Sequence, residues 1–160
     1  MTIPAKAVMT TDVVTVSPET TVAEIARRMV ARRISAIPVV DAGNRPLGVV
    51  SEGDVLRHFG AEFQGKRAQW LRHLAEGEAL SQHFLAAIGL DQRRAKDLMH
   101  GPAITAGEET SLAEIGDTML AKGIKRVLIQ RDGVLVGIVS RADVMRAVVE
   151  NLPDLLEPTS

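Results

Sequence analysis

The chain has 160 residues, a formal net charge of −1 and no cysteine, which fits one compact domain or two small ones that share a core. The missing cysteines exclude disulfides, thiolate metal sites and a cysteine nucleophile. The near-neutral charge, with only three Phe, one Trp and no Tyr, argues against a nucleic-acid partner and against attraction to an acidic membrane.

The beginning of the chain carries no targeting pattern. Residues 1–6 lack the basic-then-apolar order of a signal peptide, and no apolar run in the sequence is long enough to span a bilayer. We therefore expect a cytoplasmic protein without a membrane partner.

One sequence unit occurs twice in the chain. Three segments of the first copy match three segments of the second: Ala5–Met9 with Ala95–Met99, Glu19–Ile25 with Glu109–Ile115, and Gly48–Asp54 with Gly137–Asp143. We assign residues 5–58 to the first copy, 95–150 to the second copy, 59–94 to an insert between them and 151–160 to a tail.

Each copy predicts the order β-α-β-β-α. In the first copy Val13–Val16 is a β-branched strand, and Val22–Arg32 has its apolar residues at helical spacing. Ala36–Val40 and Leu47–Val50 are predicted as two strands of an antiparallel hairpin, and a helix follows Asp54. A three-stranded sheet of this size cannot bury its own apolar face. We therefore expect an α+β fold in which two such motifs pack sheet to sheet as a pseudo-twofold pair.

The insert has no counterpart in the second copy. Two stretches of it, residues 66–75 and 78–88, have apolar side chains at helical spacing, including Trp70 and Phe84. We expect a helical insert that packs on the repeated module; the alternative is an element that docks a partner.

The segments Gly48–Asp54 and Gly137–Asp143 each place a serine and an aspartate three residues apart at a strand-to-helix junction. The first turn of a helix has unpaired N–H groups and favours negative charge, so it suits a phosphate. A neighbouring carboxylate accepts hydrogen bonds from vicinal hydroxyls, and a phosphate beside a diol describes a nucleotide. The alternative is a capping box, in which serine and acid only satisfy the helix start. A single copy favours the cap, and the repetition strengthens the case for a site.

Catalysis and metal binding have no support in the sequence. No Gly-x-Ser-x-Gly, Walker or Gly-x-Gly-x-x-Gly motif occurs. The four histidines, His58, His73, His83 and His100, lack ligand spacing and are interpreted as solvated or partly packed side chains. We expect no catalytic residue, no metal and no cofactor.

Several segments follow one known pattern. In the first copy they are Val8–Thr10, Val14–Pro18, Ile37–Asp41 and Gly48–Asp54, and in the second they are Leu98–Met99, Gly123–Ile129 and Gly137–Asp143. On these segments the chain resembles the CBS domain family, named after cystathionine β-synthase and usually found as tandem pairs called Bateman modules. The resemblance covers nearly the whole chain apart from the insert and the tail. It implies a regulatory module that binds adenine nucleotides and related molecules in the cleft between its paired sheets, without catalysis of its own.

The resemblance also implies a set of ligand contacts. The ribose-binding acids are Asp54 and Asp143. The residues that match hydroxyl- and phosphate-binding positions are Ser51, Ser140, Lys125, Arg126 and Thr10, and those that match the base walls are Val13, Val14, Ile37, Pro38, Ala103, Ile104, Val127 and Leu128. In the family a cleft commonly combines the acid of one motif with the base walls of the other.

The two copies are not identical at these positions. Ser35 of the first copy aligns with Lys125 of the second, Ala36 aligns with Arg126, and Thr10 aligns with His100. We therefore expect two unequal clefts, of which the tighter one receives phosphates from the basic pair. With the family's cross-pairing, that cleft joins Asp54 with the walls around Ile104 and Val127, unless Arg126 reaches across the module.

By this resemblance, the chain is expected to be a sensor of AMP, ADP, ATP or NAD(H), with S-adenosylmethionine as a less favoured ligand. It is expected to form a homodimer and to signal through a protein effector or through its own assembly. The alternative is a purely structural dimerisation module whose serines and aspartates are only helix caps.

Overall fold

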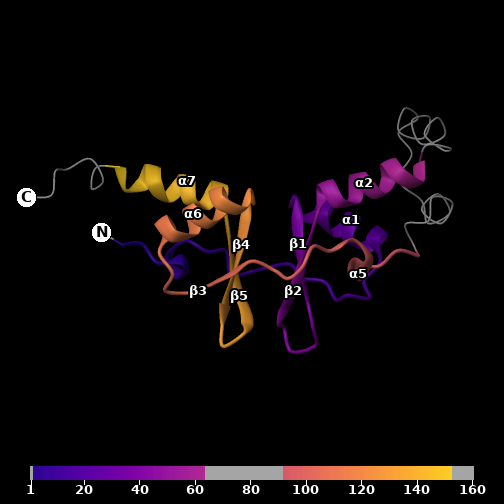
Figure 1. Ribbon diagram of the computed structural model, residues 1–160, viewed down its shortest axis with the longest axis horizontal. Helices are drawn as coiled ribbons and strands as arrows, with labels where there is room; N and C mark the ends of the chain where they lie inside the picture. Colours follow the sequence, from indigo (N-terminus) through magenta and orange to yellow (C-terminus); the bar gives the residue numbers. More distant parts are fainter. Residues whose placement is uncertain (1, 64–91, 153–160) are drawn as a thin grey trace, which may run out of the picture. The chain divides into compact units, whose positions relative to one another are not determined.

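The computed structural model describes residues 2–63 and 92–152 (Figure 1). Contacts divide the chain into two compact units. Unit 1 consists of Met1–Val13, Gly43–Pro46 and Ala103–Ser160, and unit 2 consists of Val14–Ala42 and Leu47–Pro102. Most of the insert predicted at residues 59–94 lies outside the described residues, and its first part continues helix α2 (Glu52–Phe63).

Unit 2 is built on a two-stranded sheet of β1 (Ala36–Val40) and β2 (Pro46–Ser51). Helix α1 (Val22–Arg32) and helix α2 pack on one face of this sheet, and α5 (Ala95–Leu98) completes the unit (Figure 1). The core gathers buried apolar side chains from these elements: Val22, Ile25, Met29, Ile37, Val39, Val50, Val55 and Ala95. The predicted helix Val22–Arg32 and strand Ala36–Val40 are confirmed.

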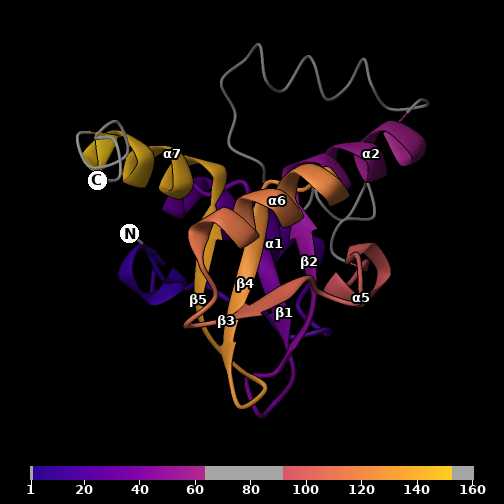
Figure 2. The same cartoon turned by 60° about the vertical axis from the view of Figure 1, so that its left-hand side comes forward.

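Unit 1 has a three-stranded sheet. Strand β3 (Thr105–Gly107) runs parallel to β4 (Arg126–Arg131), and β4 runs antiparallel to β5 (Val134–Ser140). Helices α6 (Leu112–Lys122) and α7 (Arg141–Glu150) lie along the sheet (Figure 2). They bury a core of Leu112, Ile115, Met119, Val127, Ile129, Val139 and Ala147. The predicted α+β class and the antiparallel hairpin of the second copy are therefore confirmed.

The first segment of each copy belongs to the unit that holds the strands of the other copy. The 3-10 helix η1 (Ala5–Ala7) lies in unit 1, where Thr10 and Ile138 exchange two backbone hydrogen bonds of 2.9 and 3.0 Å. Helix α5 lies in unit 2, where His100 and Val49 exchange two bonds of 3.0 and 3.1 Å. Thr10 and His100 thus occupy equivalent positions in the two units.

The strand predicted at Val13–Val16 is wrong except at its last residue, because Val16 alone bridges to β1. In unit 1 the equivalent segment forms β3, and the Leu128 N–H donates to the Ile104 carbonyl at 3.1 Å. Pro38 takes the place of Leu128 in unit 2. Because proline has no N–H, that bond cannot form and the ladder is shortened.

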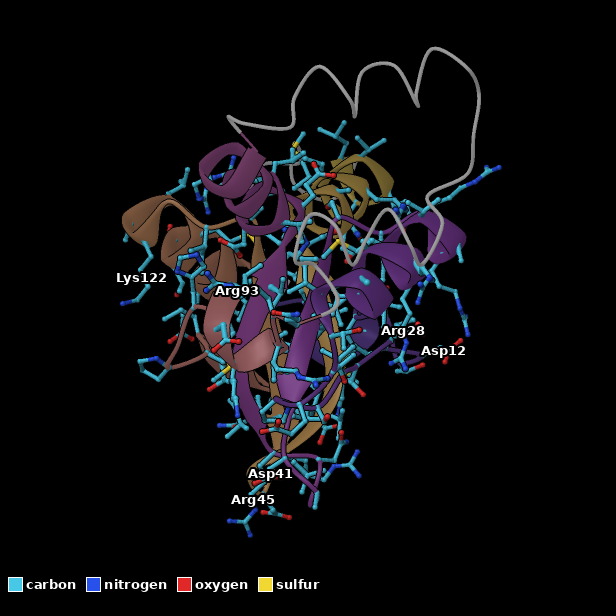
Figure 3. All side chains as sticks on the ribbon, turned by 90° about the vertical axis from the view of Figure 1, so that its right-hand side faces the viewer. Asp12, Arg28, Asp41, Arg45, Arg93 and Lys122 are labelled. Carbon is cyan, nitrogen blue, oxygen red and sulfur yellow. The ribbon has the colours of Figure 1, made fainter. Side chains whose placement is uncertain are left out.

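The Thr15 carbonyl, next to the bridge between Val16 and Val39, is bonded to a side chain and not to a neighbouring strand. Arg28 on α1 donates from its guanidinium to the Thr15 carbonyl at 3.0 Å (Figure 3). In the second copy the aligned residue is Thr118, whose hydroxyl bonds within its own helix to the Glu114 carbonyl. The two copies therefore hold the segment before their first helix by different bonds.

The helices after β2 and β5 begin three residues earlier than predicted. Helix α2 begins at Glu52 and α7 at Arg141, so Asp54 and Asp143 lie inside the first turn and do not precede it. The shift arises because the serine of each motif serves as the N-cap and the acid three residues later stands at the third helical position. Among the described residues, no helix combines the length and the apolar character needed to cross a bilayer.

Candidate functional site

The junction between β2 and α2 holds Ser51 and Asp54 in reciprocal hydrogen bonds. The Ser51 N–H donates to Asp54 Oδ2 at 2.8 Å, and the Ser51 hydroxyl donates to the same oxygen at 2.9 Å. In return the Asp54 N–H donates to Ser51 Oγ at 3.3 Å. This arrangement is a capping box, and it satisfies donors at the helix start that would otherwise have no partner.

The junction between β5 and α7 repeats this geometry. Ser140 donates to Asp143 Oδ2 from its backbone at 2.8 Å and from its hydroxyl at 3.0 Å, and the Asp143 N–H donates back at 3.2 Å. Both acids are buried, with 6% of Asp54 and 8% of Asp143 exposed. The cap that the sequence offered as an alternative is therefore present in both copies. It engages one oxygen of each carboxylate and leaves Oδ1 for other partners.

The Oδ1 atoms distinguish the two copies. Asp54 Oδ1 lies 2.5 Å from His100 Nε2 and 2.5 Å from the Arg57 guanidinium. Burial raises the pKa of Asp54, but the hydrogen bonds from Ser51 and from His100 outweigh it and hold that pKa below its usual value. The carboxylate is therefore ionised at neutral pH and already surrounded by donors.

The second copy leaves its acid less occupied. Within the described residues, the charged partner of Asp143 Oδ1 is Arg146, whose guanidinium lies 3.2 Å away. The position equivalent to His100 is held by Thr10, an exposed residue. A ligand hydroxyl therefore meets fewer competitors at Asp143 than at Asp54.

The basic pair of the second copy lies beside its capping box. Arg126 is the β4 partner of Ser140, and the Arg141 N–H at the start of α7 donates to the Lys125 carbonyl at 3.0 Å. Lys125 is exposed. In unit 2 the same bond runs from the Glu52 N–H to the Ser35 carbonyl at 2.8 Å, so the first copy has an acid and a hydroxyl where the second has cations.

The predicted base-wall residues lie in two kinds of environment. Ile37 and Val127 are buried in the cores of unit 2 and unit 1, against the helices. Pro38 and Leu128 follow them in the strands and are also buried, but they lie on the opposite face of each sheet. The other members of the set, Val13, Val14, Ala103 and Ile104, are half-buried. The helix-facing pair thus has a structural role in each core.

Two segments of the chain match the same family model, described as the CBS domain: residues 5–61 and residues 95–150. Together these segments make up more than half of the chain. The chain belongs to the CBS domain family. CBS domains are regulatory modules and are generally not catalytic.

Relatives of known structure share the tandem CBS fold. The CBS domain of a membrane protein from Sphaerobacter thermophilus is 29% identical, with a TM-score of 0.70 over 91% of this chain and 87% of that one. CBSX2 of Arabidopsis thaliana, solved in complex with AMP, is 23% identical, with a TM-score of 0.69 over 92% of this chain and 94% of that one. At that identity the likeness to CBSX2 shows the fold alone.

A curated relative extends this likeness to sequence. The chloroplastic protein CBSX1 of Arabidopsis thaliana is 29% identical over 149 residues, which are 87% of this chain and 60% of that protein. The chain spans about half to three fifths of the length of the first curated CBS relatives that it matches.

The sequence analysis did not identify the charged partners of the two acids, which are Arg57 and His100 at Asp54 and Arg146 at Asp143. His100 was interpreted as solvated or partly packed, and 73% of its side chain is indeed exposed, yet its ring reaches Asp54. The difference between Thr10 and His100 was the available signal. It could not be interpreted as a contact with Asp54 without knowing that each first segment joins the strands of the other copy. Within the described part of the chain, no group of three or more His, Asp or Glu side chains is arranged to hold a metal ion.

Proposed function

We propose that this chain is a regulatory module that binds an adenine nucleotide and signals through a protein partner or through its own assembly as a homodimer. The observation that carries the proposal is Asp143 Oδ1, which has fewer competing donors than Asp54 Oδ1 and lies in the same unit as a basic pair. Among CBS proteins of similar fold, CBSX2 was solved with AMP, the CBS domain of a bacterial CNNM/CorC family Mg2+ transporter with ATP, and the MJ0100 pair with 5′-methylthioadenosine and S-adenosylmethionine. These ligands share an adenosine group.

The ribose is assigned to the acids of the two motifs. Cross-pairing by family resemblance predicted Asp54 for the cleft with the basic pair, but we place Asp143 first because Asp54 Oδ1 already contacts both Arg57 and His100. Asp143 Oδ2 is fixed by Ser140, which holds the carboxylate in one orientation and keeps Oδ1 in place for the hydroxyls of a ribose. A hydrogen bond to a charged acceptor contributes about 1.5–3 kcal/mol. Asp54 has the same cap but a crowded Oδ1, so its contribution to affinity is expected to be smaller.

The phosphates are assigned to Lys125 and Arg126, and the base to the walls around Ile104 and Leu128. Cationic side chains make charge-assisted hydrogen bonds to phosphate oxygens. The side chain of Leu128 lies on the sheet face away from the helices of unit 1. AMP, ADP, ATP and NAD(H) all present phosphate to the basic pair, and S-adenosylmethionine does not. The proposal therefore favours a nucleotide over S-adenosylmethionine.

A structural dimerisation module remains the second candidate, because the capping boxes give Ser51, Asp54, Ser140 and Asp143 a complete structural role. The two candidates make different predictions. A structural dimerisation module does not need cations beside one capping box, and its stability does not depend on adenosine or phosphate.

Replacing the basic pair tests the phosphate assignment. In calorimetric titrations, Lys125→Ala and Arg126→Ala are each expected to weaken AMP binding about three- to tenfold and to leave adenosine binding unchanged, since each removes one partly screened charge contact. Added salt should weaken AMP binding to the wild type more than adenosine binding. Lys122→Ala, which removes an exposed cation from the end of α6, is the matched control for net charge (Figure 3). Equal losses for AMP and adenosine, or no loss for either, would show that the pair does not hold phosphate.

A further inference from the structure

His100, at the end of the first segment of the second copy, contacts Asp54, the acid of the first motif. His100 follows helix α5 and forms a backbone bridge with Val49 of β2. This bridge places its ring nitrogen Nε2 2.5 Å from Asp54 Oδ1. The Asp54 side chain is 4% exposed, whereas the His100 side chain is 73% exposed. A largely exposed ring therefore lies over a buried carboxylate, and it has room to move away.

Three elements surround this carboxylate. Strand β2 contributes the neutral N–H and hydroxyl of Ser51, helix α2 contributes the Arg57 guanidinium, and the segment after α5 contributes the His100 ring. Among the described residues, Arg57 and His100 are the charged or titratable groups that contact Asp54. An arginine side chain keeps its charge throughout the physiological pH range, whereas an imidazole is the side-chain type that can gain or lose a proton within it.

We propose that His100 blocks Asp54 from ribose and makes adenosine binding at the first motif dependent on pH, while binding at the second motif is not. This inference rests on the proposed function and assigns its regulation. A protonated imidazole donates a charge-assisted hydrogen bond to Oδ1, the oxygen that a ribose hydroxyl needs. When the ring loses its proton, the bond to Asp54 becomes a weaker neutral one, and the ribose displaces the ring more easily. Thr10 carries no charge, so the equivalent acid Asp143 has no such competitor.

Adenosine is the appropriate probe, because it presents the ribose and has no phosphate that titrates near neutral pH. Its binding is measured by calorimetry at about pH 6 and about pH 8, on either side of the usual histidine range. The Asp143→Asn variant reports the first motif, and the Asp54→Asn variant reports the second. Circular dichroism at both pH values verifies that each variant is folded.

The first motif is expected to bind adenosine about tenfold more weakly at pH 6 than at pH 8, the difference between a charged and a neutral hydrogen bond to Asp54. The second motif should change less than about twofold, because Arg146 holds its charge across this range. Adding His100→Thr, which copies the residue of the other unit, or His100→Gln, which keeps a neutral donor, should remove the pH difference and raise affinity at pH 6.

Two results would overturn the inference. If the first motif binds adenosine equally at both pH values, or if the His100 variants keep the pH difference, His100 does not compete with ribose, while the proposed function stands because adenosine binds. If neither folded single variant binds adenosine or AMP at any pH, the inference and the proposed function fall together.

Discussion

Asp143→Asn is expected to weaken AMP binding about tenfold or more and to change the free energy of unfolding only slightly. The amide oxygen of asparagine still accepts from the Ser140 N–H, so the cap at the start of α7 is largely kept. What the variant loses is the negative charge that strengthens a hydrogen bond from ribose, a contribution of about 1.5–3 kcal/mol. Calorimetry with AMP and a thermal unfolding curve measure the two effects separately.

Two companion variants make this result decisive. Asp143→Ala removes the acid's half of the capping box as well as the charge, while the Ser140 hydroxyl still accepts from the N–H of residue 143, so the variant should also lose about 0.5–1.5 kcal/mol of stability. Asp54→Asn is the matched substitution in the first motif. It should weaken AMP binding less at neutral pH, because His100 and Arg57 already occupy Oδ1. An Asp143→Asn protein with wild-type AMP affinity would show that this acid is a cap alone.

Gly48→Ala is expected to destabilise unit 2 by about 1–3 kcal/mol, the usual cost of forcing atoms into a packed site. A Cβ at this position would lie 2.5 Å from the His100 carbonyl oxygen and 3.2 Å from its carbon. That carbonyl is held by the Val49 N–H at 3.1 Å, so the backbone cannot move without losing the bridge between β2 and the segment after α5. Thermal or denaturant unfolding measures the loss.

Gly137→Ala is the matched substitution in unit 1, and its loss should be smaller. Its Cβ would meet Met9 Sδ, with Met9 Cγ at 2.8 Å and Met9 Cβ at 3.1 Å. The sulfur and Cγ of a flexible methionine can rotate away where a backbone carbonyl cannot. Combining Gly137→Ala with Met9→Ala should therefore recover part of the loss, whereas Met99→Ala should not rescue Gly48→Ala. Equal losses for the two alanine variants would contradict the close backbone contact at Gly48.

Much of the fold could be predicted from local pattern, because the two copies report the same structure twice. The repeat located both hairpins, and helical spacing placed Val22–Arg32 correctly. The strand at Val13–Val16 failed because its partner strand contains Pro38, so a missing N–H in one segment decided the length of another. A prediction made one segment at a time does not detect such a dependence.

The two capping boxes could be predicted from residue types, but the partners of their acids could not. Ser-x-x-Asp identified the capping boxes, and the acids kept one oxygen for other partners. The sequence showed two differences between the copies, the cations Lys125 and Arg126 and the exchange of Thr10 for His100, but it did not show what His100 contacts. The structure adds His100 on Asp54, a contact made by residues 46 positions apart that depends on which unit each first segment joins.

Thermal unfolding of the whole chain with added nucleotide tests the central claim most directly. Held at 100 times its dissociation constant, a nucleotide that binds the folded state should stabilise it by about 2.7 kcal/mol. AMP, ADP, ATP and NAD(H) are expected to raise the unfolding temperature, and the double variant Asp54→Asn and Asp143→Asn should lose this shift. No rise with any of these nucleotides at millimolar concentration, in a folded wild-type protein, would contradict nucleotide sensing and leave the capping boxes as structural elements of a dimerisation module.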